Sequence, residues 1–176
     1  MDEPTAAPGA VEESAPRGEG ASLLAVDLGV RAGLALFGRD GRLRWQRSQN
    51  FGNLARLRRA VPPLLRAAPS LAWLVLEGGG APAQAWEREA AALGVPVRRV
   101  QADHWREALL YPRERRTGRE AKQRAEQMAR RIAVWSGARV PKTLRHDAAE
   151  AVLLGLWAVL DLGWLPTLPP ELRRGD

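Results

Sequence analysis

The sequence predicts an α/β fold in which helices pack against a β-sheet. Short apolar runs typical of strands are separated by segments with helical spacing, in the order βββαβαβ followed by further helices. The last of these, residues 146–162, is apolar on nearly every side, so it must pack against a sheet or a partner. The chain has 176 residues, 45% of them hydrophobic, which suits one domain with a substantial core.

Three strands are predicted where the folded region begins. Residues 22–26 form an apolar run without alternation, which indicates a strand buried on both faces. Residues 34–37 form a second run, an Asp-Gly turn follows at 40–41, and residues 43–47 alternate in character. Together these segments predict an antiparallel three-stranded meander.

The next segment predicts a helix and a fourth strand. Asn53 is placed to cap the helix, and the Pro62-Pro63 pair should kink or split it because proline lacks the N–H that a helix needs. Residues 71–76 form another continuous apolar run and predict the fourth strand.

The second half of the chain predicts two more helices around a fifth strand. Pro82 opens a helix that Gly94 closes, and residues 95–100 follow as the strand. Thr117 and Glu120 have the spacing of a capping box before a long helix that continues to residue 135.

The charge of the chain is unevenly distributed. Net charge is +7, but residues 1–20 carry five acids against one arginine, which leaves +11 on residues 21–176. We expect residues 1–20 to be a disordered acidic tail and residues 21–176 to be the functional domain. A basic domain suits a polyanionic partner such as nucleic acid. A GC-rich genome is an alternative explanation for the preference of arginine over lysine.

Composition also limits the cellular setting. The chain has no cysteine, which excludes disulfides and thiolate metal sites. No apolar run approaches the roughly 20 residues that span a bilayer, and no secretory signal opens the sequence. We therefore expect a cytoplasmic protein that does not enter a membrane.

Acidic residues stand at one end of three apolar segments. Asp27 ends the first strand, and Glu77 ends the fourth. Asp147 and Glu150 lie in the first turn of the last helix, where their i, i+3 spacing puts both on one face.

Carboxylates gathered from separate segments are typical of divalent-metal chemistry. Mg²⁺ prefers carboxylate oxygens, and Mn²⁺ is able to replace it. Two such ions roughly 3.5–4 Å apart activate water and stabilise the leaving oxygen in phosphodiester cleavage. The hypothesis is that Asp27 bridges two Mg²⁺ ions while the other three acids complete their coordination.

Three motifs in a fixed order carry a family resemblance. Residues 24–33 (LAVDLGVRAG) present an Asp followed by two glycines, residues 74–77 (LVLE) end in Glu, and residues 146–151 (HDAAEA) open a helix with two acids. Over about residues 22–160 this pattern resembles the RuvC-type Holliday-junction resolvases of the RNase H-like superfamily. The segments around Trp105-Arg106 and His146-Asp147 resemble phage-type relatives more closely.

The resemblance implies a mixed five-stranded RNase H-like sheet with helices on both faces, in which strands one and four are adjacent and Asp27 meets Glu77. It also implies a Mg²⁺-dependent endonuclease that cleaves branched DNA such as Holliday junctions, and a homodimer. Two departures stand out. Glu150 replaces the commoner final Asp, and residues 78–81 (GGGA) replace the stretch in which bacterial resolvases carry an aromatic residue.

Several other residues are candidates for the same site. His146 borders the acids, where it would ligate metal, position the attacking water or cap the helix. A basic cluster around a predicted loop and helix start is placed to bind DNA phosphates, although a solvated helix face is the alternative. Its members are Arg113, Arg115, Arg116, Arg119 and Lys122. Most tryptophans are core candidates, with base stacking as an alternative for Trp86 and Trp105.

Three functions are compatible with these patterns, and a fourth is set aside. The favoured one is a structure-selective DNA endonuclease, and an RNA-processing nuclease of the same superfamily is the first alternative. A non-catalytic nucleic-acid-binding module is the second, although the complete set of four acids argues against it. An actin-like ATPase would need a second lobe with a second phosphate loop, for which the chain has no room.

Overall fold

The computed structural model describes residues 18, 20–109 and 118–173. Its centre is a five-stranded sheet in the order β3-β2-β1-β4-β5. The strands are β1 (Ser22–Asp27), β2 (Arg31–Gly38), β3 (Leu43–Asn50), β4 (Leu71–Glu77) and β5 (Val97–Val100). β1, β2 and β3 form an antiparallel meander, whereas β1–β4 and β4–β5 pair in parallel. The predicted mixed sheet is therefore confirmed.

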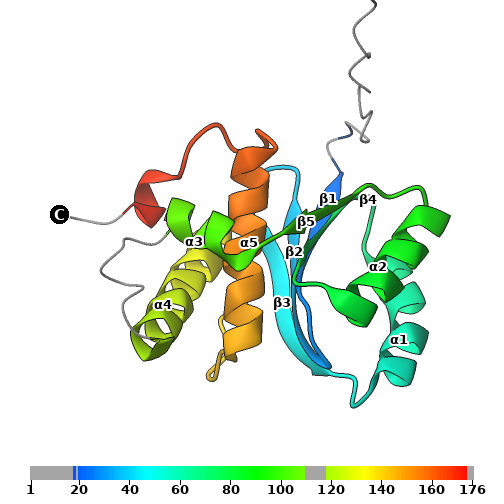
Figure 1. Cartoon of the computed structure of the whole chain (residues 1–176). Helices are drawn as coiled ribbons and strands as arrows, with labels where there is room; N and C mark the ends of the chain where they lie inside the picture. Colours follow the sequence, from blue (N-terminus) through cyan, green and yellow to red (C-terminus); the bar gives the residue numbers. More distant parts are fainter. Residues whose placement is uncertain (1–17, 19, 110–117, 174–176) are drawn as a thin grey trace, which may run out of the picture.

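Helices cover both faces of the sheet, as predicted (Figure 1). α1 (Leu54–Ala67) and α2 (Gly80–Ala92) lie on one face, and α3 (Ala102–Leu109), α4 (Gly118–Ser136) and α5 (His146–Asp161) lie on the other. A short 3-10 helix, η2 (Pro170–Leu172), follows near the C-terminus. In the described part of the chain, no helix is both long enough and apolar enough to cross a membrane. The expected acidic tail lies outside the described residues, apart from Gly18 and Gly20.

Helix α1 corrects one expectation about proline. Asn53 caps it as predicted, since its side-chain oxygen accepts the Arg56 N–H at 2.9 Å. The helix nevertheless continues through Pro62 and Pro63, so the prolines do not split it. Its stripe of Leu57, Val61 and Leu65 is fully buried, and this tertiary packing compensates for the missing hydrogen bonds.

The fifth strand is shorter than the sequence indicates. The Val95 N–H donates to the Ala90 carbonyl at 2.9 Å and closes the end of α2, so the strand begins only at Val97. The proposed capping residue of α4, Thr117, lies outside the described residues.

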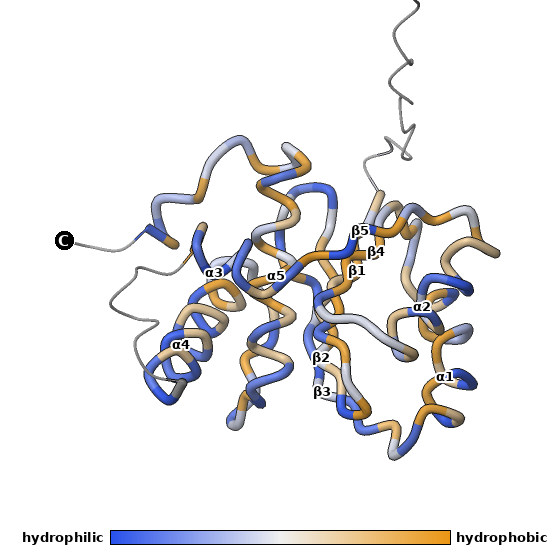
Figure 2. The backbone as a smooth tube through the Cα atoms, viewed as in Figure 1, coloured by the Kyte–Doolittle hydropathy of each residue, from blue (hydrophilic) through white to orange (hydrophobic). Residues whose placement is uncertain are grey.

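Burial explains the hydropathy of the central strands. Leu23, Leu24, Ala25 and Val26 of β1 are at most 1% exposed because helices pack on both faces. Figure 2 shows hydrophobic residues along β1 and β4, whereas α4 alternates between hydrophilic and hydrophobic residues. The alternation fits a helix that packs through one side only.

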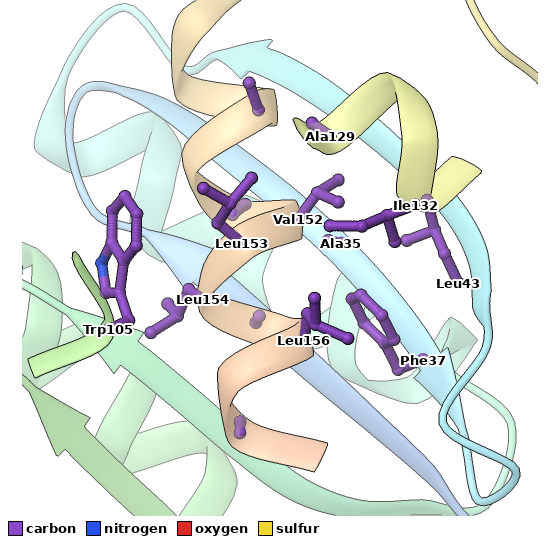
Figure 3. Packing of buried hydrophobic residues seen from close by; sticks show 14 of the residues in the cluster. Ala35, Phe37, Leu43, Trp105, Ala129, Ile132, Val152, Leu153, Leu154 and Leu156 are labelled. Atoms are coloured by element: carbon purple, nitrogen blue, oxygen red, sulfur yellow. The ribbon is translucent and has the colours of Figure 1, made fainter. Parts of the chain in front are cut away.

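Helix α5 is the centre of the larger core. Val152 and Leu156 pack with Phe37 of β2 and with Ile132 of α4 (Figure 3). Burying each such side chain contributes roughly 1.5–3 kcal/mol. The contact is tight at Gly155, where a Cβ atom would lie 2.2 Å from Cε2 of Phe37. This packing fixes α5 rigidly against the sheet.

We expect Gly155→Ala to lower the free energy of unfolding by about 1–3 kcal/mol, because overpacking outweighs the better helix propensity of alanine. Urea denaturation measures this change. Adding Phe37→Leu should recover part of the loss, since it vacates the contacted space. Gly20→Ala serves as the control because the nearest atom there is 3.9 Å away. Equal stability of Gly155→Ala and wild type would contradict the tight packing.

Candidate functional site

Two carboxylates meet at the C-terminal edge of the parallel pair. Asp27 ends β1 and Glu77 ends β4, and the two are direct partners in the register. The pairing continues one residue further, where the Leu28 N–H donates to the Glu77 carbonyl at 3.0 Å. The expected adjacency of strands one and four is confirmed.

A glycine allows α5 to reach the same edge. Gly33 of β2 is the antiparallel partner of Asp27. A Cβ atom at Gly33 would lie only 1.8 Å from the carbonyl oxygen of Asp147, so no other residue fits beneath the start of α5. The glycine therefore lets the helix bring Asp147 and Glu150 towards β1.

Three of the four acids have specific protein partners. Glu77 is 8% exposed and accepts a hydrogen bond from the Trp105 indole N–H at 2.5 Å. Glu150 is equally buried. Its Oε1 lies 2.5 Å from the Arg106 guanidinium, and its Oε2 lies 3.3 Å from Nε2 of His146.

Asp147 is held by two donors on the other side of the cluster. It accepts the Ser48 hydroxyl at 2.6 Å and the backbone N–H of Ala148 at 2.9 Å. Ser48 lies on the edge strand β3, so the acid is tied across the sheet. The sequence interpretation missed this partner because nothing near residue 48 signals a site.

Trp105 is a buried residue that supports the acids and does not stack on DNA bases. Both Trp86 and Trp105 are fully buried, so the base-stacking alternative is wrong and the core interpretation is right. Trp105 also supports the site through its bond to Glu77. Neighbouring Arg106, which contacts Glu150, was likewise missed. The one sign in the sequence was the resemblance of this segment to phage-type relatives.

His146 lies beside the acids as expected. Its Nε2 faces Glu150, and its Nδ1 is buried with no hydrogen-bond partner among the residues that the structure describes. That nitrogen is therefore shielded from solvent and lacks a partner within the described part of the chain.

Comparison with known proteins gives structural matches only. The sequence matches no protein-family model and no curated protein. The structure is similar to *T. thermophilus* RuvC in complex with a Holliday junction substrate, with a TM-score of 0.60 and 17% identity over 81% of this chain and 96% of that one. It is also similar to a second *Thermus thermophilus* RuvC structure, with a TM-score of 0.58, 19% identity and the same coverage. This chain has a RuvC-like fold. The predicted RNase H-like architecture is thereby confirmed.

Burial and the neighbouring acids disfavour the ionised form of Asp27. Burial, followed by the negative charges of Glu150, Glu77 and Asp147, raises the pKa of Asp27 to about 8, and Arg106 opposes this shift. Burial also raises the pKa of Glu77, with the Glu150 charge adding to it. The Trp105 hydrogen bond and Arg106 act in the opposite direction. The charges of the three other acids therefore act on Asp27, and the charge of Glu150 also acts on Glu77.

The donor set suits a hard divalent cation. Carboxylate oxygens from three elements converge, and their mutual repulsion is what such an ion relieves. Across the described residues, however, no three acid or His side chains are arranged so that they could hold one ion. Glu77, Glu150 and Asp147 accept hydrogen bonds from Trp105, Arg106 and Ser48 respectively, so some of their oxygens already have protein partners.

The described part of the chain includes only two of the five basic residues predicted to bind DNA. Arg113, Arg115 and Arg116 lie outside the described residues, and Arg119 and Lys122 are exposed on α4. Arg31, which begins β2, and Arg145, which precedes α5, are also exposed beside the elements that carry the acids. Neither had been singled out in the sequence.

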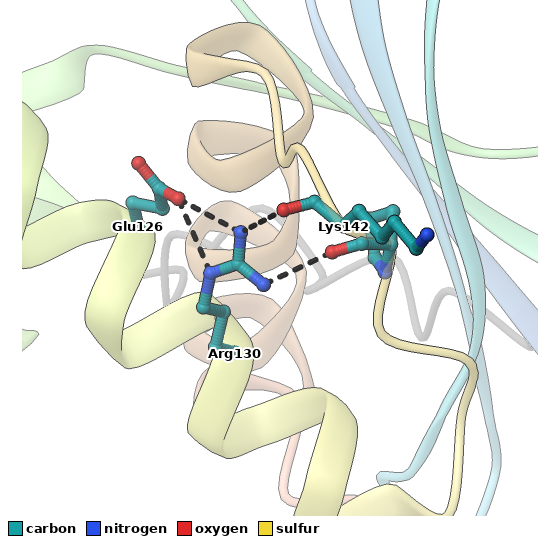
Figure 4. A network of polar contacts seen from close by, with 4 residues as sticks. Glu126, Arg130 and Lys142 are labelled. Carbon is teal, nitrogen blue, oxygen red and sulfur yellow. Dashed lines mark hydrogen bonds and ion pairs between the residues drawn. The ribbon is translucent and has the colours of Figure 1, made fainter.

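Arg130, which lies further along α4, is structural. Its guanidinium donates to Glu126 and to the carbonyls of Pro141 and Lys142, at 3.0–3.2 Å (Figure 4). These bonds anchor the loop that leads into α5 and so help to place His146. Gln46 of β3 holds the same loop through the Arg139 carbonyl at 3.0 Å.

The raised pKa of Asp27 predicts a pH-dependent stability. The folded chain keeps this proton to about pH 8, whereas the ordinary carboxyl value is 3.8. The folded state thus binds the proton more tightly, and stability falls as pH rises between those values. Asp27→Asn should stabilise the metal-free protein at pH 8 by at least about 1 kcal/mol, or roughly 2–4 °C, and by less at pH 5.

Thermal unfolding at both pH values in EDTA measures this effect. Asp40→Asn is the matched control, since Asp40 is exposed on a turn and pairs with Arg44 at 2.9 Å. A gain for Asp27→Asn that does not grow from pH 5 to pH 8 would show that the pKa of Asp27 is not raised in the folded protein.

Proposed function

We propose that this chain is a divalent-metal-dependent endonuclease that cleaves branched DNA. The observation that carries the proposal is the convergence of Asp27, Glu77, Asp147 and Glu150 on one edge of a RuvC-like sheet. Such a concentration of partly buried carboxylates is unfavourable for folding, which favours a functional reason for it.

The proposed roles follow from where each side chain lies. Asp27 is central, since the charges of all three other acids act on it, so its carboxylate would be one of the ligands of a bound cation. Glu77, Asp147 and Glu150 would complete the oxygen ligands. A bound Mg²⁺ or Mn²⁺ supplies activation of water and neutralisation of charge on the phosphate. His146, whose Nε2 faces Glu150, would orient water beside the acids.

Branched DNA as the substrate is supported by charge and by fold. Residues 21–176 carry a net +11, which suits a phosphate backbone. Arg119 and Lys122 are exposed, and together with Arg113, Arg115 and Arg116 they would bind the strands. A similarly folded RuvC has been solved with a Holliday junction substrate. A homodimer would place two sites on two strands related by a two-fold axis.

One observation favours a second candidate, a nucleic-acid-binding module without catalysis. Among the described residues the acids are not arranged to hold a metal ion, and Glu77, Asp147 and Glu150 each have protein partners. A module of this kind would retain the basic surface while its acids serve only in internal hydrogen bonds.

Cleavage of labelled DNA separates these functions. Four-way junction, flap, linear duplex and RNA–DNA hybrid are incubated with wild type in Mg²⁺, Mn²⁺ or EDTA. We expect paired incisions in the junction that require metal. Asp27→Asn should reduce the rate at least about a hundredfold, the scale seen when transition-state stabilisation is lost. Asp40→Asn should cleave like wild type.

Each other outcome identifies a different function. Metal-dependent cutting of the flap alone keeps a nuclease but excludes the resolvase. Cutting only of the RNA-containing substrate indicates the RNA-processing alternative. Binding without cleavage under every metal condition supports the non-catalytic module and refutes the proposed roles of the four acids.

A further inference from the structure

Two consecutive residues of α3 engage two of the four acids. The Trp105 indole N–H donates to Glu77, and the Arg106 guanidinium pairs with Glu150, both at 2.5 Å. The two side chains also support each other, because the Arg106 guanidinium lies over the Trp105 ring, 5.0 Å from its centroid. Helix α3 thus contacts the acid cluster with one cation and one neutral donor.

Arg106 supplies the positive charge that the cluster needs in the absence of metal. It opposes the raised pKa of both Asp27 and Glu77, so its field reaches beyond its direct partner. The Glu150 side chain is only 10% exposed, and a carboxylate buried to this extent needs a compensating partner. An arginine side chain keeps its charge at every physiological pH.

The same contact obstructs a metal ion. Glu150 uses one oxygen for Arg106 and turns the other towards His146, while an oxygen of Glu77 is held by Trp105. A guanidinium and a divalent cation on one carboxylate repel each other. Arg106 is 34% exposed, so its side chain has room to move towards solvent.

We propose that the Arg106 guanidinium is a built-in counter-cation of the acid cluster, which leaves Glu150 when a divalent metal ion binds. Arg106 is then a positioning residue: it keeps the cluster assembled without metal and sets the affinity for metal by competition. This inference rests on the proposed metal-dependent function.

The first test is Mn²⁺ binding by the full chain, followed by the electron paramagnetic resonance signal of free Mn²⁺. Arg106→Gln should bind Mn²⁺ about five- to tenfold more tightly than wild type, on the scale of a partly exposed ion pair and its field. Arg106→Lys keeps a competing charge and should stay within about twofold of wild type. If Arg106 only supported the fold, its removal would weaken binding instead.

The chain offers a matched control for this substitution. Arg98 of β5 also pairs with one carboxylate, Asp161, and lies over a tryptophan, Trp157, at 5.2 Å from the ring centroid. Its side chain is 39% exposed, close to the value for Arg106. Arg98→Gln removes the same charge away from the acids and should leave Mn²⁺ affinity unchanged.

The second test follows the displacement directly in wild type. Phenylglyoxal modifies accessible arginines, and mass spectrometry measures its reaction with Arg106 and Arg98 in parallel. Saturating Mn²⁺ should speed the modification of Arg106 several-fold relative to Arg98.

The outcomes distinguish this inference from the function on which it rests. Mn²⁺ binding with unchanged Arg106 reactivity, or with unaltered affinity in Arg106→Gln, would overturn the exchange while leaving the metal-dependent function in place. Failure of wild type and all variants to bind Mn²⁺ would overturn both.

Discussion

The gathering of four carboxylates at one partly buried edge is the constraint to which the rest of the site responds. Burial and like charge both disfavour the ionised forms, which is why the pKa of Asp27 rises to about 8. Three separate elements supply the charges, so the movement of one side chain does not relieve the repulsion. Stabilising partners must come from neighbouring elements: Trp105 and Ser48 supply neutral hydrogen-bond donors, and Arg106 supplies a positive charge.

The fold keeps the acids together by making their positions a consequence of packing. Asp27 and Glu77 are neighbours because parallel strands in register end at the same level. Helix α5 is buried along nearly its whole length, so its first turn has little freedom to retreat from β1. The close approach of α5 to the sheet depends on Gly33, since any side chain there would push the helix away from the strand.

The sequence predicted the acids but not the residues that hold them. The antiparallel meander, the cap at Asn53 and the acids at element ends were predictable, because each depends on spacing within a short segment. The adjacency of strands one and four came from the family resemblance instead. The partners Ser48, Trp105 and Arg106 lie 99, 28 and 44 residues from the acids they contact, so only tertiary structure reveals them. Trp105 was ambiguous because tryptophan suits both a core and a base-stacking surface. The Pro62-Pro63 pair does not split the helix, because packing of the helix outweighed local propensity.

A shared fold at 17–19% identity leaves the chemistry to be decided within the site. The protein donors and a divalent cation would compete for the same carboxylate oxygens, so the strengths of the two kinds of interaction must be compared. A neutral hydrogen bond such as that from Ser48 contributes roughly 0.5–1.5 kcal/mol net, and one to a charged group about 1.5–3 kcal/mol. A divalent ion bound as proposed would offset the mutual repulsion of the carboxylates. Bonds of this strength would then be enough to hold the acids in place without metal, yet weak enough to be exchanged for the ion.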